Sequence, residues 1–275
     1  MPELTLSPGN SLSYDYSPPE DGGFTFVCFN ALTGDKGMWH ALFGSVLEGT
    51  GHGLLAYNLR GQAGSAFTFT DLDVAGIVAD ARALIDHVSP PDPIHVGLSI
   101  GGLFGIEAHL AGGAATARGL VLITTGRRAG ARLDWVNEAV VTAARTGGLD
   151  LVRDLYAPLL FNEEWQAENR ANFLKPGGYT PLPDGDGSLL LLAAGGTANW
   201  DIAYESLTLP VLSVTGLQDR VFRDADDIDT LTARLPDVDR LDMPNAGHMV
   251  PVERPAELAG AILNFADSIR TGRRR

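Results

Sequence analysis

The stretch HVGLSIGG, residues 95–102, places a serine among glycines between two contrasting segments. IHVGL before the serine has the composition of a buried strand, and GGLFGIEAHL after it has the pattern of a helix. A strand that turns directly into a helix forces its corner residue into strained backbone angles, and small neighbours two positions away relieve the crowding. Gly97 and Gly101 occupy those positions. The pattern predicts that Ser99 stands exposed at the amino end of a helix, where backbone N–H groups favour developing negative charge.

Strand-like and helix-like segments alternate along most of the chain. Several of the strand-like segments are continuous apolar runs, which is typical of central parallel strands buried on both faces. We therefore predict an α/β fold with an eight-stranded, mostly parallel sheet flanked by helices, its first two strands forming an antiparallel edge pair. The expected strands are Leu4–Ser7, Leu12–Ser17, Phe24–Asn30, Gly53–Leu59, Ile94–Leu98, Gly119–Thr125, Val211–Thr215 and Arg240–Met243, and the expected helices are Asp71–Val88, Leu103–Leu110, Asp226–Leu235 and Pro255–Ile269.

Residues 127–206 interrupt this alternation because they have helical patterns but no convincing central strand. LDWVNEAVVTAARTGGLDLVRDLYAPLLF predicts two amphipathic helices, and NEEWQAENRANFL predicts a third. We interpret this region as a helical cap, or lid, inserted between the sixth and seventh strands. Residues 1–126 and 207–275 would then form the core domain.

A serine nucleophile needs a base and a carboxylate that orients the base, and both residue types follow late strands. His248 follows the last strand in MPNAGHMVPVERP, at the sheet edge where Ser99 is expected. Asp219 follows the seventh strand in PVLSVTGLQDRVF, whereas the acids from residue 224 onward lie in the start of a helix. The chain order Ser, Asp, His is the order that strand-to-helix nucleophile turns of this kind use. We predict a catalytic triad of Ser99, Asp219 and His248.

An oxyanion hole for this triad needs two backbone N–H donors. Ile100 directly follows the nucleophile and is the first expected donor. The second is expected in the loop after the third strand, FNALTGDKGMW, where Leu32 is preferred and Ala31 is the alternative. Trp39, Trp135 and Trp200 are the large residues nearest in sequence to the expected pocket and cap, so they are candidate substrate contacts, although tryptophan more often packs in a core.

Composition excludes several classes of function. The net charge of −14 opposes nucleic-acid binding, because phosphates would be repelled. No apolar stretch approaches the roughly 18 residues of a membrane helix, and no secretory leader is visible, so a cytoplasmic location is expected. Cys28 is the only cysteine and lies in an apolar run. With no P-loop, HExxH or EF-hand pattern, no metal or cofactor is expected. A homo-oligomer is compatible with the sequence.

The motifs FNALTGDKGMW, NLRGQAGS, GLSIGG, GLVLITT, PVLSVTGLQD and NAGHMVPVERP, in that order, resemble the α/β-hydrolase fold family. Within that family the chain is most similar to the 3-oxoadipate enol-lactonase branch. Members of that branch tend to have an Asn-Ser-Leu-Gly type loop that ends in Met-Trp, and here Asn30-Ala31-Leu32 leads to Met38-Trp39. The chain departs from the family at Asn58, where an aspartate is usual, and at Ala63, where a glycine is usual.

The resemblance implies a serine hydrolase that cleaves a small-molecule ester or lactone through an acyl-enzyme. A carbon–carbon bond hydrolase or a thioesterase would use the same triad, and a non-catalytic receptor could retain the fold and the pocket. Arg127, Arg128 and Arg132 at the start of the cap could attract an anionic lactone, but we interpret them as surface residues.

Overall fold

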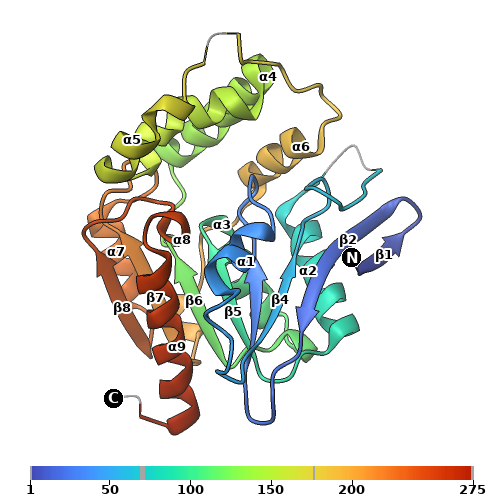
Figure 1. The fold of residues 1–275 in the computed structure, drawn as a ribbon, viewed down its shortest axis with the longest axis vertical. Helices are drawn as coiled ribbons and strands as arrows, with labels where there is room; N and C mark the ends of the chain where they lie inside the picture. The colour runs from blue at the N-terminus through green and yellow to red at the C-terminus, as the bar shows by residue number, and fades with distance from the viewer. Residues whose placement is uncertain (1, 69–71, 176, 274–275) are drawn as a thin grey trace.

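The computed structural model describes residues 2–68, 72–175 and 177–273. In these residues, eight strands form one sheet in the order β1-β2-β4-β3-β5-β6-β7-β8 (Figure 1). β1 pairs antiparallel with β2, and β2 with β4, whereas the remaining neighbours are parallel. The predicted fold class is confirmed, and each expected strand lies within two residues of an observed one. The strands are β1 (Glu3–Ser7), β2 (Asn10–Ser17), β3 (Thr25–Phe29), β4 (Gly53–Tyr57), β5 (Pro93–Leu98), β6 (Gly119–Ile123), β7 (Val211–Gly216) and β8 (Val238–Met243).

Helices cover both faces of the sheet. The helices are α1 (Gly37–Phe43), α2 (Val74–Val88), α3 (Ile100–Leu110), α4 (Ala131–Leu160), α5 (Glu163–Asn169), α6 (Gly187–Ala194), α7 (Ala225–Ala233), α8 (Val250–Glu253) and α9 (Pro255–Thr271), with 3-10 turns at Gly113–Ala115, Arg170–Asn172, Gly195–Thr197 and Tyr204–Ser206. The expected N-terminal residue of α2, Asp71, lies outside the described residues, and Asp73 caps the helix by accepting the N–H of Gly76 at 2.7 Å. α1 and α8 were not predicted because they are too short to show a helical period.

The central strands are buried on both faces, as their apolar composition predicts. All five residues of β3 are buried. Because successive side chains of a strand point to opposite faces, Val27 and Phe29 join the core under α2 and α3. Phe26 and Cys28 join the core under α1, α8 and α9. β3 and β5 are both buried along their whole length, and the residues that follow them, Leu32 and Ser99, belong to the site described below.

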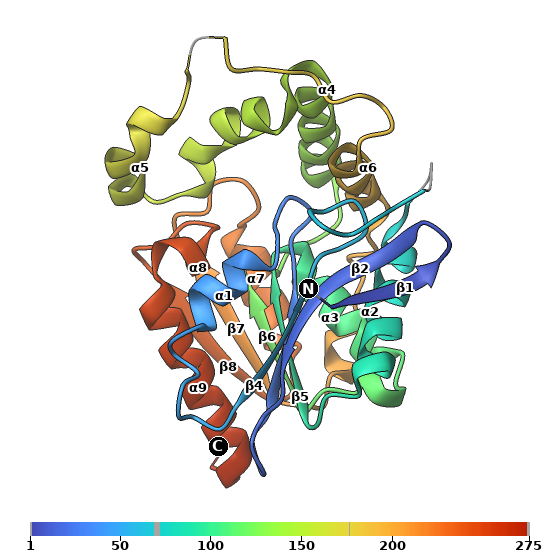
Figure 2. The ribbon, with the colours of Figure 1, turned by 45° about the vertical axis from the view of Figure 1, so that its right-hand side comes forward.

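The segment between β6 and β7 contains α4, α5 and α6, which lie together at one end of the sheet in both views (Figures 1 and 2). The two helices expected in the first part of this segment are the two halves of α4, because Gly147 and Gly148 have non-helical angles and kink it. The third expected helix is α5. α6 was not predicted. None of the described helices is long and apolar enough to cross a bilayer.

Candidate active site

Ser99 is the corner residue between β5 and α3. Its φ is 57°, in the left-handed region that residues other than glycine rarely adopt, and α3 begins at the next residue. A Cβ on Gly101 would collide with the carbonyl oxygen of Phe29, and one on Gly97 would collide with the backbone of Gly101. The glycines therefore allow the corner to pack directly on β3. This geometry agrees with the expected tight turn and explains why α3 begins three residues earlier than predicted.

His248 and Asp219 form a buried pair. Nδ1 of His248 lies 2.7 Å from Oδ2 of Asp219. The other carboxylate oxygen, Oδ1, accepts the N–H groups of Val221 and Phe222 at 2.9 and 3.0 Å. Burial alone would raise the pKa of Asp219, but the His248 imidazole and these N–H donors outweigh burial and lower the pKa to about 2. Asp219 is therefore ionised near neutral pH and holds the imidazole in a fixed orientation.

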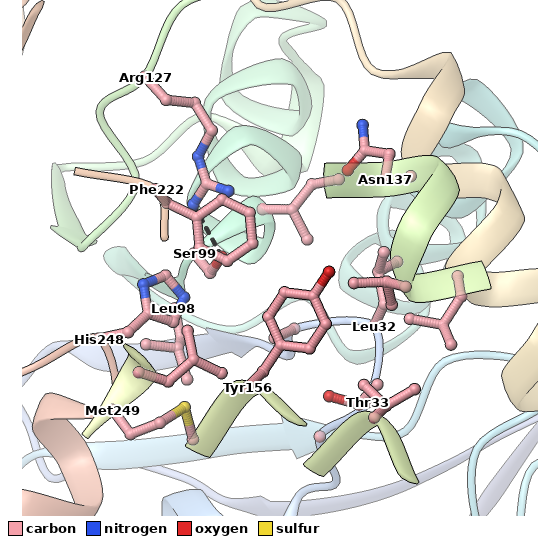
Figure 3. Close-up of a pocket in the computed structure, with 18 of the residues that line it drawn as sticks. Leu32, Thr33, Leu98, Ser99, Arg127, Asn137, Tyr156, Phe222, His248 and Met249 are labelled. Atoms are coloured by element: carbon pink, nitrogen blue, oxygen red, sulfur yellow. Dashed lines mark hydrogen bonds between the residues drawn. The ribbon is translucent and has the colours of Figure 1, made fainter. Parts of the chain in front are cut away.

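A pocket of about 190 Å³ brings Ser99 and His248 together beneath the helices between β6 and β7 (Figure 3). Most of its lining is apolar and comes from the loops at the ends of the strands and from α4 and α6. The polar lining side chains are few, which makes each of them informative about the ligand. The apolar lining residues include Ala31, Leu32, Met38, Leu98, Leu133, Val140, Val152, Leu160, Leu192, Trp200, Phe222 and Met249, and the polar ones are Thr33, Ser99, Arg127, Asn137, Tyr156 and His248.

Arg127 corrects the expectation that the three cap arginines lie on the surface. It is 5 % exposed, and its Nη2 donates to Oγ of Ser99 at 2.8 Å. No hydrogen bond joins Ser99 Oγ to His248 within the described part of the chain. Arg127 reaches Ser99 because Leu98 of β5 is in register with Ile123 of β6, so the residues that follow each strand are neighbours. Arg128 and Arg132 are exposed, as expected.

The guanidinium of Arg127 is held between two aromatic rings. Its Cζ lies 4.7 Å from the ring centroid of Trp200 and 4.2 Å from that of Phe222. Burial lowers the pKa of Arg127 to about 10, an effect that the negative charge of Asp219 partly offsets. Arg127 is therefore still a cation at neutral pH. No feature of the sequence distinguishes this arginine from its neighbours, because its burial depends on which strands are adjacent.

The expected oxyanion-hole residues, Leu32 and Ile100, line the same pocket as Ser99. Among the described residues, neither backbone N–H has an acceptor. The loop that carries Leu32 is fixed by Gln62, whose Nε2 donates to the carbonyl oxygens of Ala31 and Leu32 at 2.9 and 3.2 Å. Oε1 of Gln62 in turn accepts from Asn30 at 2.9 Å. Both N–H groups are thus available to a ligand, that of Leu32 on a loop held by Gln62 and that of Ile100 at the start of α3.

The three tryptophans proposed as substrate contacts have different positions. Trp200 lines the pocket and stacks on Arg127. Trp39 does not line it; the side chain is fully buried, and its Nε1 donates to Oδ1 of Asn30 at 2.7 Å, which supports the Leu32 loop. Trp135 is 78 % exposed and lies in a separate groove on α4. Residues 133, 137 and 140 of α4 face the pocket. Trp135 is two positions from residues 133 and 137, so it points to the opposite side of the helix.

In the described residues, no group of three or more His, Cys, Asp or Glu side chains is arranged to hold a metal ion. Cys28 is buried in the core, away from the pocket lining, and burial raises the pKa of its thiol.

Comparison with known proteins places this geometry in a family. A model of the alpha/beta hydrolase family matches residues 26–261. Among solved structures, the enol-lactonase from Burkholderia xenovorans LB400 is similar with a TM-score of 0.80 at 20 % identity, over 97 % of this chain and 100 % of that chain. A thermophilic esterase from Thermogutta terrifontis gives a TM-score of 0.78 at 18 % identity, over 98 % and 100 % of the two chains. An esterase from Exiguobacterium antarcticum gives 0.79 at 14 % identity, over 97 % and 99 %.

No curated protein matches the chain in sequence. At these identities the solved structures show the fold, and the family model, which spans most of the chain, shows the family. The family expected from the motif order is therefore confirmed: the chain belongs to the alpha/beta hydrolase family.

Proposed function

We propose that the chain is a serine hydrolase that cleaves small carboxylic esters or lactones through an acyl-enzyme on Ser99. The observation that carries the proposal is the arrangement of Ser99 at a strained corner in the same pocket as the buried His248–Asp219 pair. A serine in this setting is the usual nucleophile of acyl transfer, and the pair supplies an oriented base.

The first step is attack of Ser99 Oγ on the substrate carbonyl while Nε2 of His248 accepts the hydroxyl proton. Because a hydroxyl can donate one hydrogen bond and accept two, the bond from Arg127 leaves the Ser99 proton available to His248. The oxyanion is stabilised by the N–H groups of Leu32 and Ile100, each worth about 2.7–4 kcal/mol in comparable sites. His248 then protonates the leaving oxygen, and water repeats the sequence to release the acid.

The pocket favours a small substrate. Its volume of about 190 Å³ and its apolar lining suit a short acyl group or a small ring. The similarity in fold to an enol-lactonase and to two esterases is consistent with both bond types. An enol-lactonase-like activity is therefore the specific form of the proposal, with general esterase activity as its broader form.

The deciding experiment compares the wild-type chain with Ser99→Ala on p-nitrophenyl acetate. We expect kcat/KM to fall by about 10⁴-fold or more, because removal of the nucleophile leaves only binding and the oxyanion hole. Ser206→Ala is the matched control, since Ser206 is exposed and, among the described residues, its hydroxyl bonds only to the carbonyl oxygen of Ala203. If Ser99→Ala, shown to be folded by circular dichroism, keeps more than a trace of turnover, Ser99 is not the nucleophile.

Two further measurements separate the related activities. A panel of esters, lactones and thioesters distinguishes an esterase or lactonase from a thioesterase, and a vinylogous 1,5-diketone reports carbon–carbon hydrolysis. Labelling of Ser99 by a fluorophosphonate distinguishes an enzyme from a receptor, because a receptor with an inactive serine does not react.

A further inference from the structure

Arg127 is a buried cation whose hydrogen-bonding capacity is only partly used. Its Nε donates to the carbonyl oxygen of Thr125 at 3.2 Å. Its Nη2 donates to the carbonyl oxygen of Thr124 at 3.0 Å and to Ser99 Oγ at 2.8 Å. Its Nη1 has no hydrogen-bond partner in the described part of the chain, and it is not among the fully enclosed orphan atoms there. Two N–H donors of a charged group are therefore left for something in the pocket.

The positive charge of Arg127 also lacks an anionic partner. No described carboxylate forms an ion pair with it. Asp219, whose charge raises the pKa of Arg127, is already bonded to His248, Val221 and Phe222. Burying an unpaired charge is costly, and two backbone carbonyls could be satisfied by a neutral donor. The buried positive charge of Arg127 destabilises the empty site, and this indicates that an anion binds to it when the site is occupied.

The surroundings prepare the guanidinium for such an anion. The rings of Trp200 and Phe222 lie against it and fix its plane without offering it a hydrogen bond. A planar guanidinium pairs best with a carboxylate, because two parallel N–H···O bonds match its geometry. The net charge of −14 makes the chain as a whole repel anions, so any preference of the pocket for an anionic ligand must come from Arg127 itself.

We propose that Arg127 forms a carboxylate-binding subsite for the acyl part of the substrate, so that the preferred substrates are half-esters or lactones whose acyl group carries a carboxylate. This inference rests on the proposed serine-hydrolase function. Nη2 contacts the atom that becomes bonded to the acyl carbon. A carboxylate on Nη1 therefore lies only a short chain away from the reacting carbonyl, as in a succinyl ester.

The acyl side is assigned from the contact between Arg127 Nη2 and Ser99 Oγ, at 2.8 Å. Arg127 comes from the loop after β6, whereas His248 comes from the loop after β8, two strands further along the sheet. The leaving oxygen must face His248 to receive its proton. The acyl substituent is attached to Ser99 Oγ in the acyl-enzyme, so it is the part of the substrate that we assign to Arg127.

The test compares an anionic and a neutral acyl group on one leaving group. p-Nitrophenyl hemisuccinate and p-nitrophenyl butyrate have acyl chains of equal length, and each rate is corrected for hydrolysis without enzyme. In the wild-type chain we expect the hemisuccinate to have the higher kcat/KM. Arg127→Gln should lower the ratio of the hemisuccinate kcat/KM to the butyrate kcat/KM at least tenfold. Arg127→Lys should have a ratio between those of Arg127→Gln and the wild-type chain, because lysine keeps the charge but lacks the two parallel N–H donors of the guanidinium.

Arg128→Gln is the matched control, because it removes the same charge from the neighbouring, exposed residue. Its ratio should equal that of the wild-type chain within a factor of two. An unchanged ratio in Arg127→Gln would overturn the subsite, even if both rates fell, because that result means that Arg127 only positions Ser99. The pair 4-acetoxybenzoate and phenyl acetate places the carboxylate on the leaving group instead of the acyl group. If Arg127→Gln lowers only the ratio of the kcat/KM values of this second pair, the anion binds on the leaving-group side and the proposed subsite is overturned.

A binding measurement tests the subsite without turnover. Succinate should raise the Tm of the Ser99→Ala chain, and butyramide, which is neutral, should not. The effect of succinate should disappear in Ser99→Ala/Arg127→Gln, and the Tm of that variant without ligand shows whether it folds. No shift with succinate in folded Ser99→Ala contradicts the subsite. If neither p-nitrophenyl ester is cleaved yet succinate binds through Arg127, the proposed hydrolase function fails while the subsite stands.

Discussion

The carboxylate of Glu253 accepts the backbone N–H of Gly247 through both oxygens, at 3.1 and 2.9 Å. The same carboxylate accepts the N–H of Asn162 at 2.6 Å. Gly247 immediately precedes His248, and Asn162 follows the end of α4, whose Leu160 accepts the His248 N–H at 2.5 Å. One buried carboxylate therefore connects the loop of the proposed base to the helices that cover the pocket.

Glu253→Gln should destabilise the chain and impair the proposed esterase activity. The neutral amide has one acceptor oxygen and no charge, so the hydrogen bonds to Gly247 and Asn162 weaken or are lost. Loss of one charge-assisted bond costs roughly 1.5–3 kcal/mol of unfolding free energy, which urea denaturation measures. Glu257→Gln in the exposed first turn of α9 is the control. It should leave the activity unchanged and cost less than about 1 kcal/mol, the usual contribution of an acid near a helix N-terminus. If Glu253→Gln were as stable as the wild-type chain, the hydrogen bonds of the Glu253 carboxylate to Gly247 and Asn162 would not stabilise the fold.

Gly101→Ala and Gly105→Ala, both in α3, should have opposite effects. A Cβ on Gly101 collides with the Phe29 carbonyl oxygen and is 2.8 Å from that of Asn30, so the corner at Ser99 must move. Overpacking of this kind costs roughly 1–3 kcal/mol, and p-nitrophenyl acetate hydrolysis should fall with it. A Cβ on Gly105 is 3.4 Å from its nearest neighbours, and alanine in a helix is favoured by about 1 kcal/mol. Equal stabilities for the two variants would contradict the close packing at the corner.

Trp200→Ala and Trp135→Ala test the positions of two of the tryptophans between β6 and β7. Trp200 is 6 % exposed, and truncating a buried tryptophan costs about 3–5 kcal/mol. Its loss also frees Arg127, so kcat/KM for p-nitrophenyl esters should fall. Trp135 is exposed, and its removal should change the unfolding free energy by no more than about 0.5 kcal/mol with activity unchanged. An activity loss in Trp135→Ala equal to that in Trp200→Ala would place Trp135 at the pocket.

Asp219→Asn should reduce the dependence of stability on pH in acid. The pKa of Asp219 is lowered from 3.8 to about 2 in the folded chain, so its contribution is complete above pH 3.8 and is lost as pH falls toward 2. A shift of this size corresponds to about 2 kcal/mol of unfolding free energy. Urea denaturation between pH 6 and pH 2.5 should therefore show a smaller decline for Asp219→Asn than for wild type. Parallel declines would mean that Asp219 is not held ionised by its partners.

Local patterns were sufficient for the core of the fold. The apolar runs of β3 to β6 and the glycine-flanked serine determine strand and helix positions within a few residues, because side-chain period and turn chemistry act between near neighbours. The order of Ser99, Asp219 and His248 along the chain also requires no tertiary information. The short helices α1 and α8 were missed, since fewer than two full periods of a helix leave no reliable pattern.

Local sequence patterns could not predict which residues meet across the sheet, or which side of a helix faces the pocket. Arg127 resembles Arg128 in the sequence, and only the pairing of β5 with β6 places one of them against Ser99. Trp135 and Leu133 are two residues apart, yet the rotation of α4 turns Leu133 into the pocket and Trp135 to the outside.

The sequence by itself thus determined the fold class, the strained corner at Ser99 and the chain order of the proposed triad. These depend on the preferences of each residue and its immediate neighbours. Only the tertiary structure decided that a cation touches Ser99 and that Trp39 supports the Leu32 loop from within the core. Strand register and helix rotation are set by the packing of the whole molecule, so no local stretch encodes which distant side chains meet in the pocket.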